Sequence, residues 1–410
     1  MATDPREGLF EFSKFKGLRN VVNARDFDPG DLEVALNVDI DAGERVTRRK
    51  GFGSVVVAGV DRGLFASGSI CLGVGSNALV QISPDWSKQT LHSGLTPNRD
   101  LSYAALADRV YYSNGVESGV VQNGARRSWG LTVPSTPAAS VTGGDLQAGR
   151  YQFAVTYLRN DGQESGAGRA GEIELSARGG VLLSSIPASA DPTVVLKAVY
   201  MTTTNGQALL RVGVLPNSQT TFTLQAPNDG AAPLGTQFLA PPPPGDHIGY
   251  SSGYALVAVG AALYPSEPYA PELFDLRKRI PFTDRITMIA PVDGGLWVGT
   301  DSQVLWLAGK DMTTWEFVER ADYGAIPGTL AYGDGELIGD GSLSGTLVPF
   351  FATKRGICIG TTTGSLQNLT ESRFAYPSQP KGAGLVRRHR GVGQYIATLN
   401  GPETAGNTAA

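Results

Sequence analysis

One pattern recurs along this chain and restricts its fold more than any other feature. An apolar segment ends in glycine or a small residue, turns within two to four polar residues, and resumes as a second apolar segment. The copies begin at Ile70, Val110, Ala255, Leu296 and Ile357. Two apolar strands joined by a short polar turn predict a β-hairpin with one buried face. The chain is therefore expected to be built from many short strands.

The spacing of these copies indicates a repeat architecture. Ile70 and Val110 are about 40 residues apart, and so are Ala255 and Leu296, which is the length of one four-stranded β-propeller blade. Leu296 and Ile357 are about 60 residues apart. The gap from Val110 to Ala255 is about 145 residues, so about 105 remain after one blade is subtracted. That remainder has the size of an inserted β-sandwich.

Two linker-like segments bound this insertion. Prolines and small residues open it at 131–140, and a polyproline run at 240–246 closes it. Between them, alternate positions of one predicted strand carry large apolar residues that would share a face: Tyr151, Phe153, Val155 and Tyr157. A second hairpin is expected around Asn205–Gly206. The segment resembles a fibronectin type III or immunoglobulin-like module, and the resemblance covers about 134–240.

We therefore predict an all-β chain, folded as a split β-propeller of five or six blades with an inserted fibronectin type III or immunoglobulin-like β-sandwich. A set of linked β-sandwiches is the alternative. One short helical turn is expected at 270–280. The predicted parts are the first part of the propeller at 1–130, the sandwich at 134–240, the second part of the propeller at 241–400, and a flexible tail at 401–410.

The composition agrees with an all-β fold and does not indicate a particular binding partner. The chain has 53 glycines and 25 prolines and only 18% charged residues, which is typical of short strands and turns. A net charge of −4 argues against a surface that binds nucleic acid throughout. No window approaches the roughly 18 apolar residues of a membrane span, and the N-terminal segment lacks the apolar region of a signal peptide. We expect no membrane span.

Cys71 and Cys358 stand alone in sequence and are predicted to be buried small hydrophobic residues.

The usual sequence signatures of an enzyme are missing or weak. His92, His247 and His389 are the only histidines and lie far apart in sequence, so a three-histidine metal site is not expected. The segment 166–171 matches G-x-G-x-x-G but opens no predicted helix, so we interpret it as a flexible loop. We predict no catalytic residues, no metal and no cofactor, and expect the protein not to be an enzyme.

An acidic pair near the N-terminus invites a functional interpretation. Asp39 and Asp41 are two positions apart on a predicted strand and face the same side. With Asp28 and Asp31 they could bind calcium. The turn that ends at Gly43 favours a structural role instead, in which the carboxylates of the pair cap turn amides or pair with nearby arginines, Arg45 and Arg48.

Two basic clusters are the other candidates. The predicted interface or lumen residues are Arg45, Arg48, Arg49 and Lys50 in the first cluster and Arg387, Arg388 and Arg390 in the second. Neither cluster is interleaved with aromatic residues that could stack on bases. We therefore expect subunit interfaces, solvated turns, or salt-dependent contacts with phosphates that do not depend on base sequence.

The N-terminal run FSKFKGLRNVVNARDFDPGDLEVALNVDIDAGERVTRRKGF, residues 12–52, resembles the start of tailed-bacteriophage virion proteins. Its pieces are a short G-L-R-N strand at 17–20, an acidic P-G-D-L turn at 29–32, and the final R-R-K-G-F. The family comprises tail-nozzle, tail-tubular and packaged-DNA stabilisation proteins built on a β-propeller. The segment 294–317 is similar to their blade hairpins. This chain is shorter than many nozzle proteins and lacks a recognisable platform segment for sealing a portal.

The resemblance implies a structural protein of the virion, located in the tail or the head-to-tail connector and assembled in the cytoplasm of the bacterial host. The family forms homo-oligomeric rings, commonly sixfold, through which DNA passes or behind which it is retained. The implied partners are other virion proteins (portal, adaptor, tail fibre or spike) and genomic DNA, contacted nonspecifically in the lumen.

Two alternatives remain open at this point. One is a receptor- or carbohydrate-binding tail adhesin that uses the sandwich as its binding module. The other, less favoured, is a propeller glycan hydrolase, which would need two carboxylates about 5–10 Å apart or a tyrosine nucleophile.

Overall fold

The computed structural model describes residues 14–36, 38–41, 43–49, 57–227, 232–338, 343–374, 376, 379–389 and 392–400. Strands dominate this part of the chain, and its helical residues form three short 3-10 turns at Ala24–Asp26, Met312–Thr314 and Gly335–Ile338. The chain divides into two compact units, one formed by Met1–Ala58 with Asp284–Ala410 and the other by Gly59–Thr283. Each unit is described separately.

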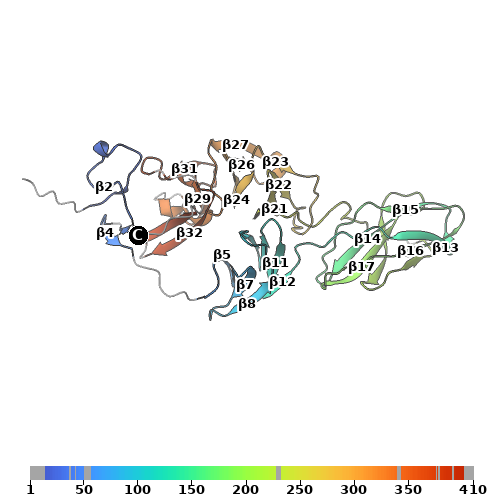
Figure 1. Cartoon of the computed structure of the whole chain (residues 1–410). Coiled ribbons are helices and arrows are strands. Elements are labelled where there is room, and N and C mark those ends of the chain that lie inside the picture. Colours follow the sequence, from blue (N-terminus) through green and yellow to red (C-terminus); the bar gives the residue numbers. More distant parts are fainter. Residues whose placement is uncertain are drawn as a thin grey trace, which may run out of the picture. The chain divides into compact units, whose positions relative to one another are not determined.

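The unit Gly59–Thr283 contains three four-stranded antiparallel sheets whose strands follow one another in sequence (Figure 1). The first has β5 (Arg62–Ser67), β6 (Ile70–Gly75), β7 (Ala78–Ile82) and β8 (Lys88–His92). The second has β9 (Ser102–Leu106), β10 (Arg109–Ser113), β11 (Ser118–Gln122) and β12 (Ala125–Arg127). The third has β20 (His247–Ser251), β21 (Tyr254–Val259), β22 (Ala262–Pro265) and β23 (Ile280–Pro281). Four-stranded meanders of this kind are propeller blades.

Neighbouring blades of this unit pack face to face. Val110 and Tyr112 point toward the first blade, where they share a core with Leu72 and Leu79. Tyr111 lies between them in sequence and points the other way, into a core with the third blade. This follows from the pleat of a strand, which sends successive side chains to opposite faces. The second blade is therefore covered on both faces.

The unit Met1–Ala58 with Asp284–Ala410 contains two further blades. One consists of β24 (Ile286–Val292), β25 (Gly295–Thr300), β26 (Val304–Ala308) and β27 (Glu316–Ala321). The other consists of β28 (Ala331–Asp334), β29 (Leu347–Thr353), β30 (Gly356–Gly360) and β31 (Leu366–Asn368). Their shared core contains Trp297, Trp306 and Phe351. Gly360 allows the close approach, because a Cβ there would lie 2.5 Å from the Trp297 ring.

Three two-stranded sheets complete this unit in the described residues. They are β1 (Gly17–Leu18) with β2 (Asp31–Leu32), β3 (Val38–Ile40) with β4 (Val46–Arg48), and β32 (Lys381–His389) with β33 (Val392–Asn400). The long β32–β33 hairpin packs against β28, and Tyr395 stacks on Phe350 with ring centroids 5.8 Å apart. It therefore covers one face of the last blade.

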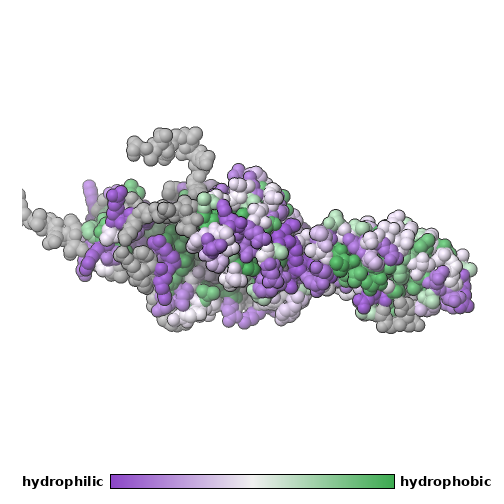
Figure 2. Space-filling model, turned by 90° about the horizontal axis from the view of Figure 1, so that it is seen from below, coloured by the Kyte–Doolittle hydropathy of each residue, from purple (hydrophilic) through white to green (hydrophobic). Residues whose placement is uncertain are grey.

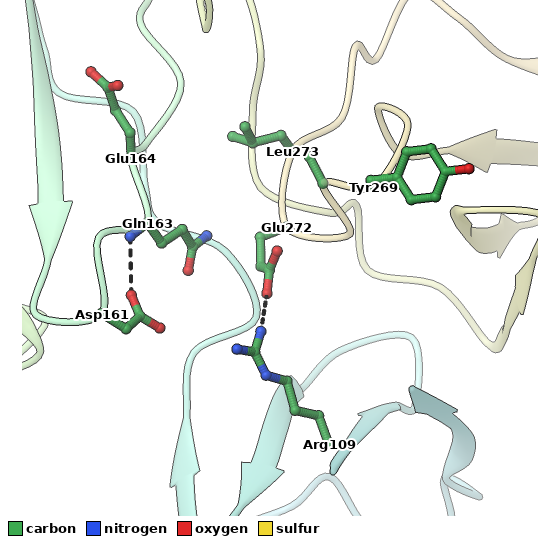
Figure 3. Close-up of a pocket in the computed structure, with 8 residues that line it drawn as sticks. Arg109, Asp161, Gln163, Glu164, Tyr269, Glu272 and Leu273 are labelled. Atoms are coloured by element: carbon green, nitrogen blue, oxygen red, sulfur yellow. Dashed lines mark hydrogen bonds and ion pairs between the residues drawn. The ribbon is translucent and has the colours of Figure 1, made fainter. Parts of the chain in front are cut away.

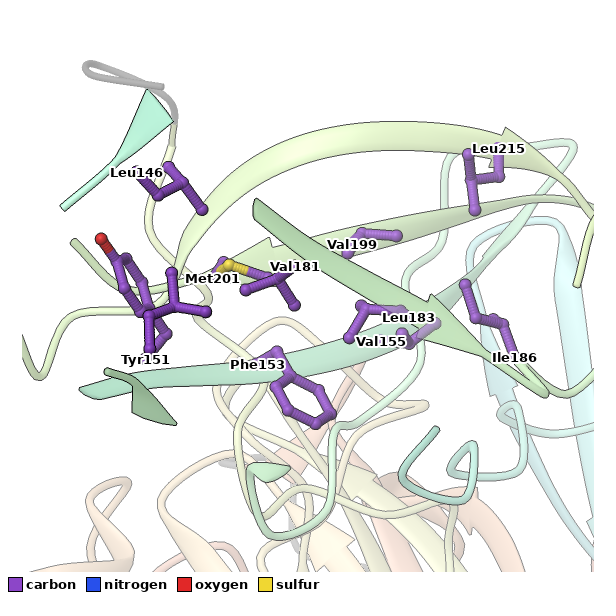
Figure 4. Packing of buried hydrophobic residues seen from close by; sticks show 11 residues of the cluster. Leu146, Tyr151, Phe153, Val155, Val181, Leu183, Ile186, Val199, Met201 and Leu215 are labelled. Atoms are coloured by element: carbon purple, nitrogen blue, oxygen red, sulfur yellow. The ribbon is translucent and has the colours of Figure 1, made fainter. Parts of the chain in front are cut away.

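The insertion consists of two sheets that face each other within the unit Gly59–Thr283. One has the order β13 (Ala138–Leu146), β16 (Gly179–Ser184), β19 (Phe222–Leu224). The other has the order β15 (Gly171–Leu175), β14 (Gly149–Arg159), β17 (Val194–Met201), β18 (Leu210–Pro216). Figure 4 shows their common core, in which Phe153 and Val155 of β14 lie near Val181 and Leu183 of β16. The fibronectin type III or immunoglobulin likeness of this segment remains a prediction.

The predicted fold class is confirmed: the chain is all-β, with the blades of a β-propeller split in sequence by a long insertion. All five predicted hairpins occur, as β6–β7, β10–β11, β21–β22, β25–β26 and β30–β31. The first four pair the second and third strands of a blade, whereas β30–β31 pairs the third and fourth. This shift by one strand explains part of the longer interval between Leu296 and Ile357, and the long connection from β28 to β29 adds to it.

Two local predictions need correction. The expected helical turn at 270–280 is wrong, because this segment forms turns and the short strand β23. Tyr151, Phe153 and Val155 share a core as expected, but Tyr157 packs in a separate cluster with Leu131 and Val194. The domain limits 1–130, 134–240 and 241–400 remain predictions, and the two compact units divide the chain at other points.

The two cysteines differ in burial, which predicts different reactivity. Cys358 in β30 is 0% exposed, and burial raises the pKa of its thiol to about 11. Cys71 in β6 is only half-buried, so its expected full burial is wrong. Because the thiolate is the reactive form, iodoacetamide should modify Cys71 in the native protein and reach Cys358 only in urea. Peptide mass spectrometry measures both, and equal modification of the native protein would contradict this packing.

Candidate functional site

The acidic pair and the first basic cluster lie together on the β3–β4 hairpin. Asp41 accepts hydrogen bonds from the backbone amides of Gly43 and Arg45, at 2.9 and 3.0 Å. Asp39 pairs with the Nε of Arg49 at 3.1 Å, rather than with the two arginines named from the sequence. Both carboxylates are therefore engaged within their own hairpin.

The arginines of this hairpin share one environment. Arg45, Arg48 and Arg49 are all exposed. Lys50 lies outside the described residues. Their roles at an interface or lumen remain predictions.

The second basic cluster lies on the β32–β33 hairpin. Arg387 donates to the side-chain oxygen of Gln394 on the opposite strand at 3.0 Å, and Arg388 lies 3.8 Å from Glu336. Arg390 lies outside the described residues. The two basic clusters are on separate two-stranded sheets of the same unit.

A charged network that the sequence did not reveal lies in the N-terminal run. The Asp31 side chain has no exposed surface and accepts from Arg19 Nη1 at 2.8 Å. Arg373 lies 3.3 Å from its other oxygen and donates to the carbonyl of Lys16. The Arg19 guanidinium holds the pKa of Asp31 below its ordinary value. The network therefore joins the start of the chain to a segment more than 350 residues later.

The same run depends on a close backbone approach. The parallel pairing of β1 with β2 brings Gly17 opposite Asp31. Gly30 precedes β2 with φ +94°, and a Cβ there would lie 2.4 Å from the carbonyl oxygen of Lys14. Only glycine fits such a position without displacing the backbone. The G-L-R-N and P-G-D-L pieces are thus partners in one local structure. Opposite charges in two short segments were the available signal for Arg19 and Asp31, whereas nothing local marks Arg373.

A hollow of about 300 Å³ lies between the loop 161–164 and the loop 269–273 of the unit Gly59–Thr283 (Figure 3). Glu272 occupies its wall and receives hydrogen bonds on Oε1 from Arg109 at 3.3 Å and from the Tyr111 hydroxyl at 3.1 Å. Burial, and then the Glu272 charge, raise the pKa of Tyr111. Arg127 pairs with Asp161 on the opposite side.

A buried arginine lies next to this hollow at the end of β14. The Arg159 side chain has no exposed surface. It donates to Gln163 Oε1 at 2.5 Å and to the carbonyl of Ser128 at 3.1 Å, and it lies 3.8 Å from Asp191. Desolvation lowers the pKa of Arg159. Its bonds reach both the insertion and the segment that follows β12. Two ion pairs, Arg127 with Asp161 and Arg109 with Glu272, therefore connect the second blade to the insertion and to the loop 269–273.

Other candidates considered from the sequence have simple surroundings. His92 bonds through Nδ1 to the Tyr112 hydroxyl at 2.8 Å. Within the described residues, no group of three or more His, Cys, Asp or Glu side chains could hold a metal ion. In the same part of the chain, no helix has the length and hydropathy needed to cross a membrane.

Comparisons with known proteins give no family. No protein-family model and no curated protein matches the chain. Among solved structures it is similar to virginiamycin B lyase from Staphylococcus aureus, with 12% identity and a TM-score of 0.32, covering 80% of this chain and 88% of that one. BBS1N in complex with ARL6DN has 12% identity and a TM-score of 0.32, covering 86% and 96%. Apo AztD from Citrobacter koseri has 13% identity and a TM-score of 0.27, covering 82% and 93%. Similarities as low as these give no information about function, and the fold class is inferred from the sheets described above.

The buried Asp31 carboxylate predicts a pH-dependent stability. Replacing Asp31 with Asn should lower the thermal unfolding midpoint at pH 7, because Arg19 and Arg373 lose their shared partner. The pKa of Asp31 is lower in the folded protein than its ordinary value of 3.8, so the ionised carboxylate stabilises the fold at pH values above 3.8. This contribution is lost as the pH falls through the lowered pKa. The difference between wild type and Asp31→Asn should therefore shrink as the pH is lowered from 7 to 3.

Calorimetry at both pH values measures this difference. Asp28→Asn is the matched control, because Asp28 also contacts Arg19 but has 61% of its side chain exposed. Equal midpoints for wild type and Asp31→Asn at pH 7 would show that the network does not stabilise the unit.

Proposed function

We propose that this protein is a structural component of a tailed-bacteriophage virion, in the tail or the head-to-tail connector, where it forms a homo-oligomeric ring that DNA passes through or is retained by. One observation carries the proposal. The N-terminal run that resembles such virion proteins is attached to blades of the propeller fold by the buried Asp31 network. The family that the resemblance implies is built on a β-propeller, and the propeller blades of this chain are compatible with that implication.

The strand edges of one unit support an assembling role. In the described part of the chain, β3 and β4 pair only with each other, and β33 pairs only with β32. Unpaired strand edges are templates for pairing with another chain. Both hairpins also carry exposed arginines, which are frequent at protein interfaces. We therefore assign the ring contacts and the contacts with portal, adaptor, fibre or spike proteins to these hairpins.

The proposed contact with DNA is weak and electrostatic. A chain of net charge −4 offers no overall attraction for phosphates. Local arginine clusters can still contact the backbone of a passing duplex without reading its bases. Such a surface would guide DNA without holding it.

The ring proposal predicts an oligomer that depends on the second basic cluster. Purified protein should form rings, sixfold by the family's example, in negative-stain images and in sedimentation velocity. Arg387→Glu with Arg388→Glu should shift the protein toward monomers, because the double variant reverses charge beside a strand edge. Arg320→Glu is the matched control, since Arg320 is exposed on β27 of the same unit.

Two results would contradict the proposal. One is a monomer at every concentration tested together with absence of the protein from purified phage particles. The other is an equal loss of rings in the Arg320 control, which would show that the β32–β33 hairpin has no special part in assembly.

The lumen proposal predicts salt-sensitive binding of double-stranded DNA. Fluorescence anisotropy with a 30-base-pair duplex should detect binding at low salt, with an affinity that falls linearly against the logarithm of salt concentration. Arg45→Gln with Arg48→Gln should reduce that slope by about one for each phosphate contact removed. Binding that depends on base sequence, or a slope that the double variant leaves unchanged, would oppose the proposed role of this cluster.

A further inference from the structure

An aromatic residue is held in a strained conformation at the end of the insertion. Phe238 has φ +64° and is 50% exposed. It occupies the third position of the turn 236–239, which is closed by a bond from Leu239 N to the carbonyl of Thr236 at 3.2 Å. Positive φ at that position normally calls for glycine or asparagine, and a bulky residue there is an outlier. Strained residues of this kind concentrate at ligand contacts.

Phe238 lines an apolar hollow of about 300 Å³. Apart from the charged pair Asp275 and Arg277, the rest of its wall consists of small or apolar residues: Val133, Ala167, Gly168, Leu239, Ala240 and Leu276. Leu276 is 44% exposed at the rim. Gly168 leaves open space, because a Cβ there would meet only Val133 Cγ1, at 3.7 Å. A hollow of this size is at the small end of ligand sites and suits one or two side chains.

Backbone hydrogen bonds hold the hollow open. Phe238 N donates to the carbonyl of Ala167 at 2.6 Å, and Ala240 exchanges two bonds of 2.9 Å with Phe274. Arg277 lies over the Phe238 ring, with its guanidinium carbon 5.4 Å from the ring centroid. Asp275 fixes Arg277 through two bonds of 2.8 and 2.9 Å. The site is therefore formed before any partner arrives, which limits the entropy lost on binding.

The rim carries excess positive charge. Arg277, Lys278 and Arg279 follow one another and are exposed, and Arg169 is exposed next to Gly168. Among the residues that the structure describes, two carboxylates pair with these side chains, Asp275 with Arg277 and Glu267 with Lys278 at 2.7 Å. An acidic partner is therefore complementary to the rim. Figure 2 shows apolar and polar surface side by side on the unit that contains this site.

We propose that this hollow binds a partner polypeptide through one aromatic or branched apolar side chain flanked by carboxylates. The apolar side chain enters between Phe238 and Leu276, and the carboxylates lie on the rim arginines and lysine. Aromatic anchors in preformed pockets supply most of the affinity of many interfaces. The site belongs to the insertion and the adjoining blade loop, so it does not depend on ring formation.

The test uses the full chain and three fluorescent hexapeptides. The probe is Glu-Glu-Phe-Leu-Glu-Glu, and its comparisons are Glu-Glu-Ala-Ala-Glu-Glu and Lys-Lys-Phe-Leu-Lys-Lys. Anisotropy titrations should show the first binding at least tenfold more tightly than either of the others. Replacing both apolar residues with alanine removes the anchor, and the lysine peptide is repelled by the rim.

Two variants separate binding from folding. Gly168→Leu fills the hollow and should weaken binding of the first peptide at least tenfold. Gly143→Leu is its matched control, because a Cβ at Gly143 meets nothing within 4 Å and Gly143 lies on β13, outside the residues that line the hollow. Phe238→Gly should also weaken binding while leaving the unfolding midpoint unchanged or higher, because glycine adopts this φ without strain.

Three outcomes would overturn the proposal. Equal affinity for all three peptides, or no binding by any of them, would rule out a partner that combines an apolar side chain with carboxylates. If wild type and Gly168→Leu bind the first peptide with equal affinity, the hollow is not the binding site. Self-association that disappears in Gly168→Leu but persists in Gly143→Leu would assign the hollow to a second copy of the chain instead.

Discussion

A blade of this fold has two apolar faces, and only contact with its neighbours can remove both from water. The β25 strand illustrates the constraint, since all six of its residues are buried. In β10, Val110 and Tyr112 pack toward one neighbour while Tyr111 packs toward the other. Apolar burial supplies about 25 cal/mol for each Å² removed from water. The stability of each blade is therefore linked to the presence of the next one.

Aromatic residues with a polar tip join neighbouring blades, and one of them joins the β32–β33 hairpin to the last blade. The Tyr103 hydroxyl bonds to the carbonyl of Gly63, and Trp129 Nε1 bonds to the carbonyl of Pro271, both at 2.8 Å. In the other unit, Trp297 Nε1 bonds to the carbonyl of Thr361 at 3.0 Å, and the Tyr395 hydroxyl bonds to that of Thr329 at 2.6 Å. Each ring fills the core while its donor satisfies a carbonyl of the element beside it, which is a neighbouring blade for the first three and the segment before β28 for Tyr395. The same side chains thus provide both packing and hydrogen bonds between elements.

The positions of the buried charged groups obey a different constraint from those of the apolar groups. Asp31 and Arg159 are fully buried side chains, and burial of a charge is tolerated only when it is paired and hydrogen-bonded. Asp31 closes the N-terminal run onto Arg373, and Arg159 joins the insertion to the segment after β12. Both lie where distant parts of the sequence meet. Their positions explain why such costly groups are present, because removing either would leave unpaired partners.

The alternation of apolar residues determined the hairpins, and their spacing determined the class of fold, because strand period and blade length are local properties of the sequence. Spacing could not show that Ile357 begins a third strand rather than a second, since loop length between strands is free to vary. The turn at Asp41 and Gly43 could also be predicted from the sequence, because the residues that form it are neighbours in the chain. Which arginine pairs with Asp39, the role of Arg373, and the hollow beside Phe238 were decided by the tertiary structure. Each of these depends on residues that are far apart in the chain, or on a backbone angle that no neighbouring residue predicts.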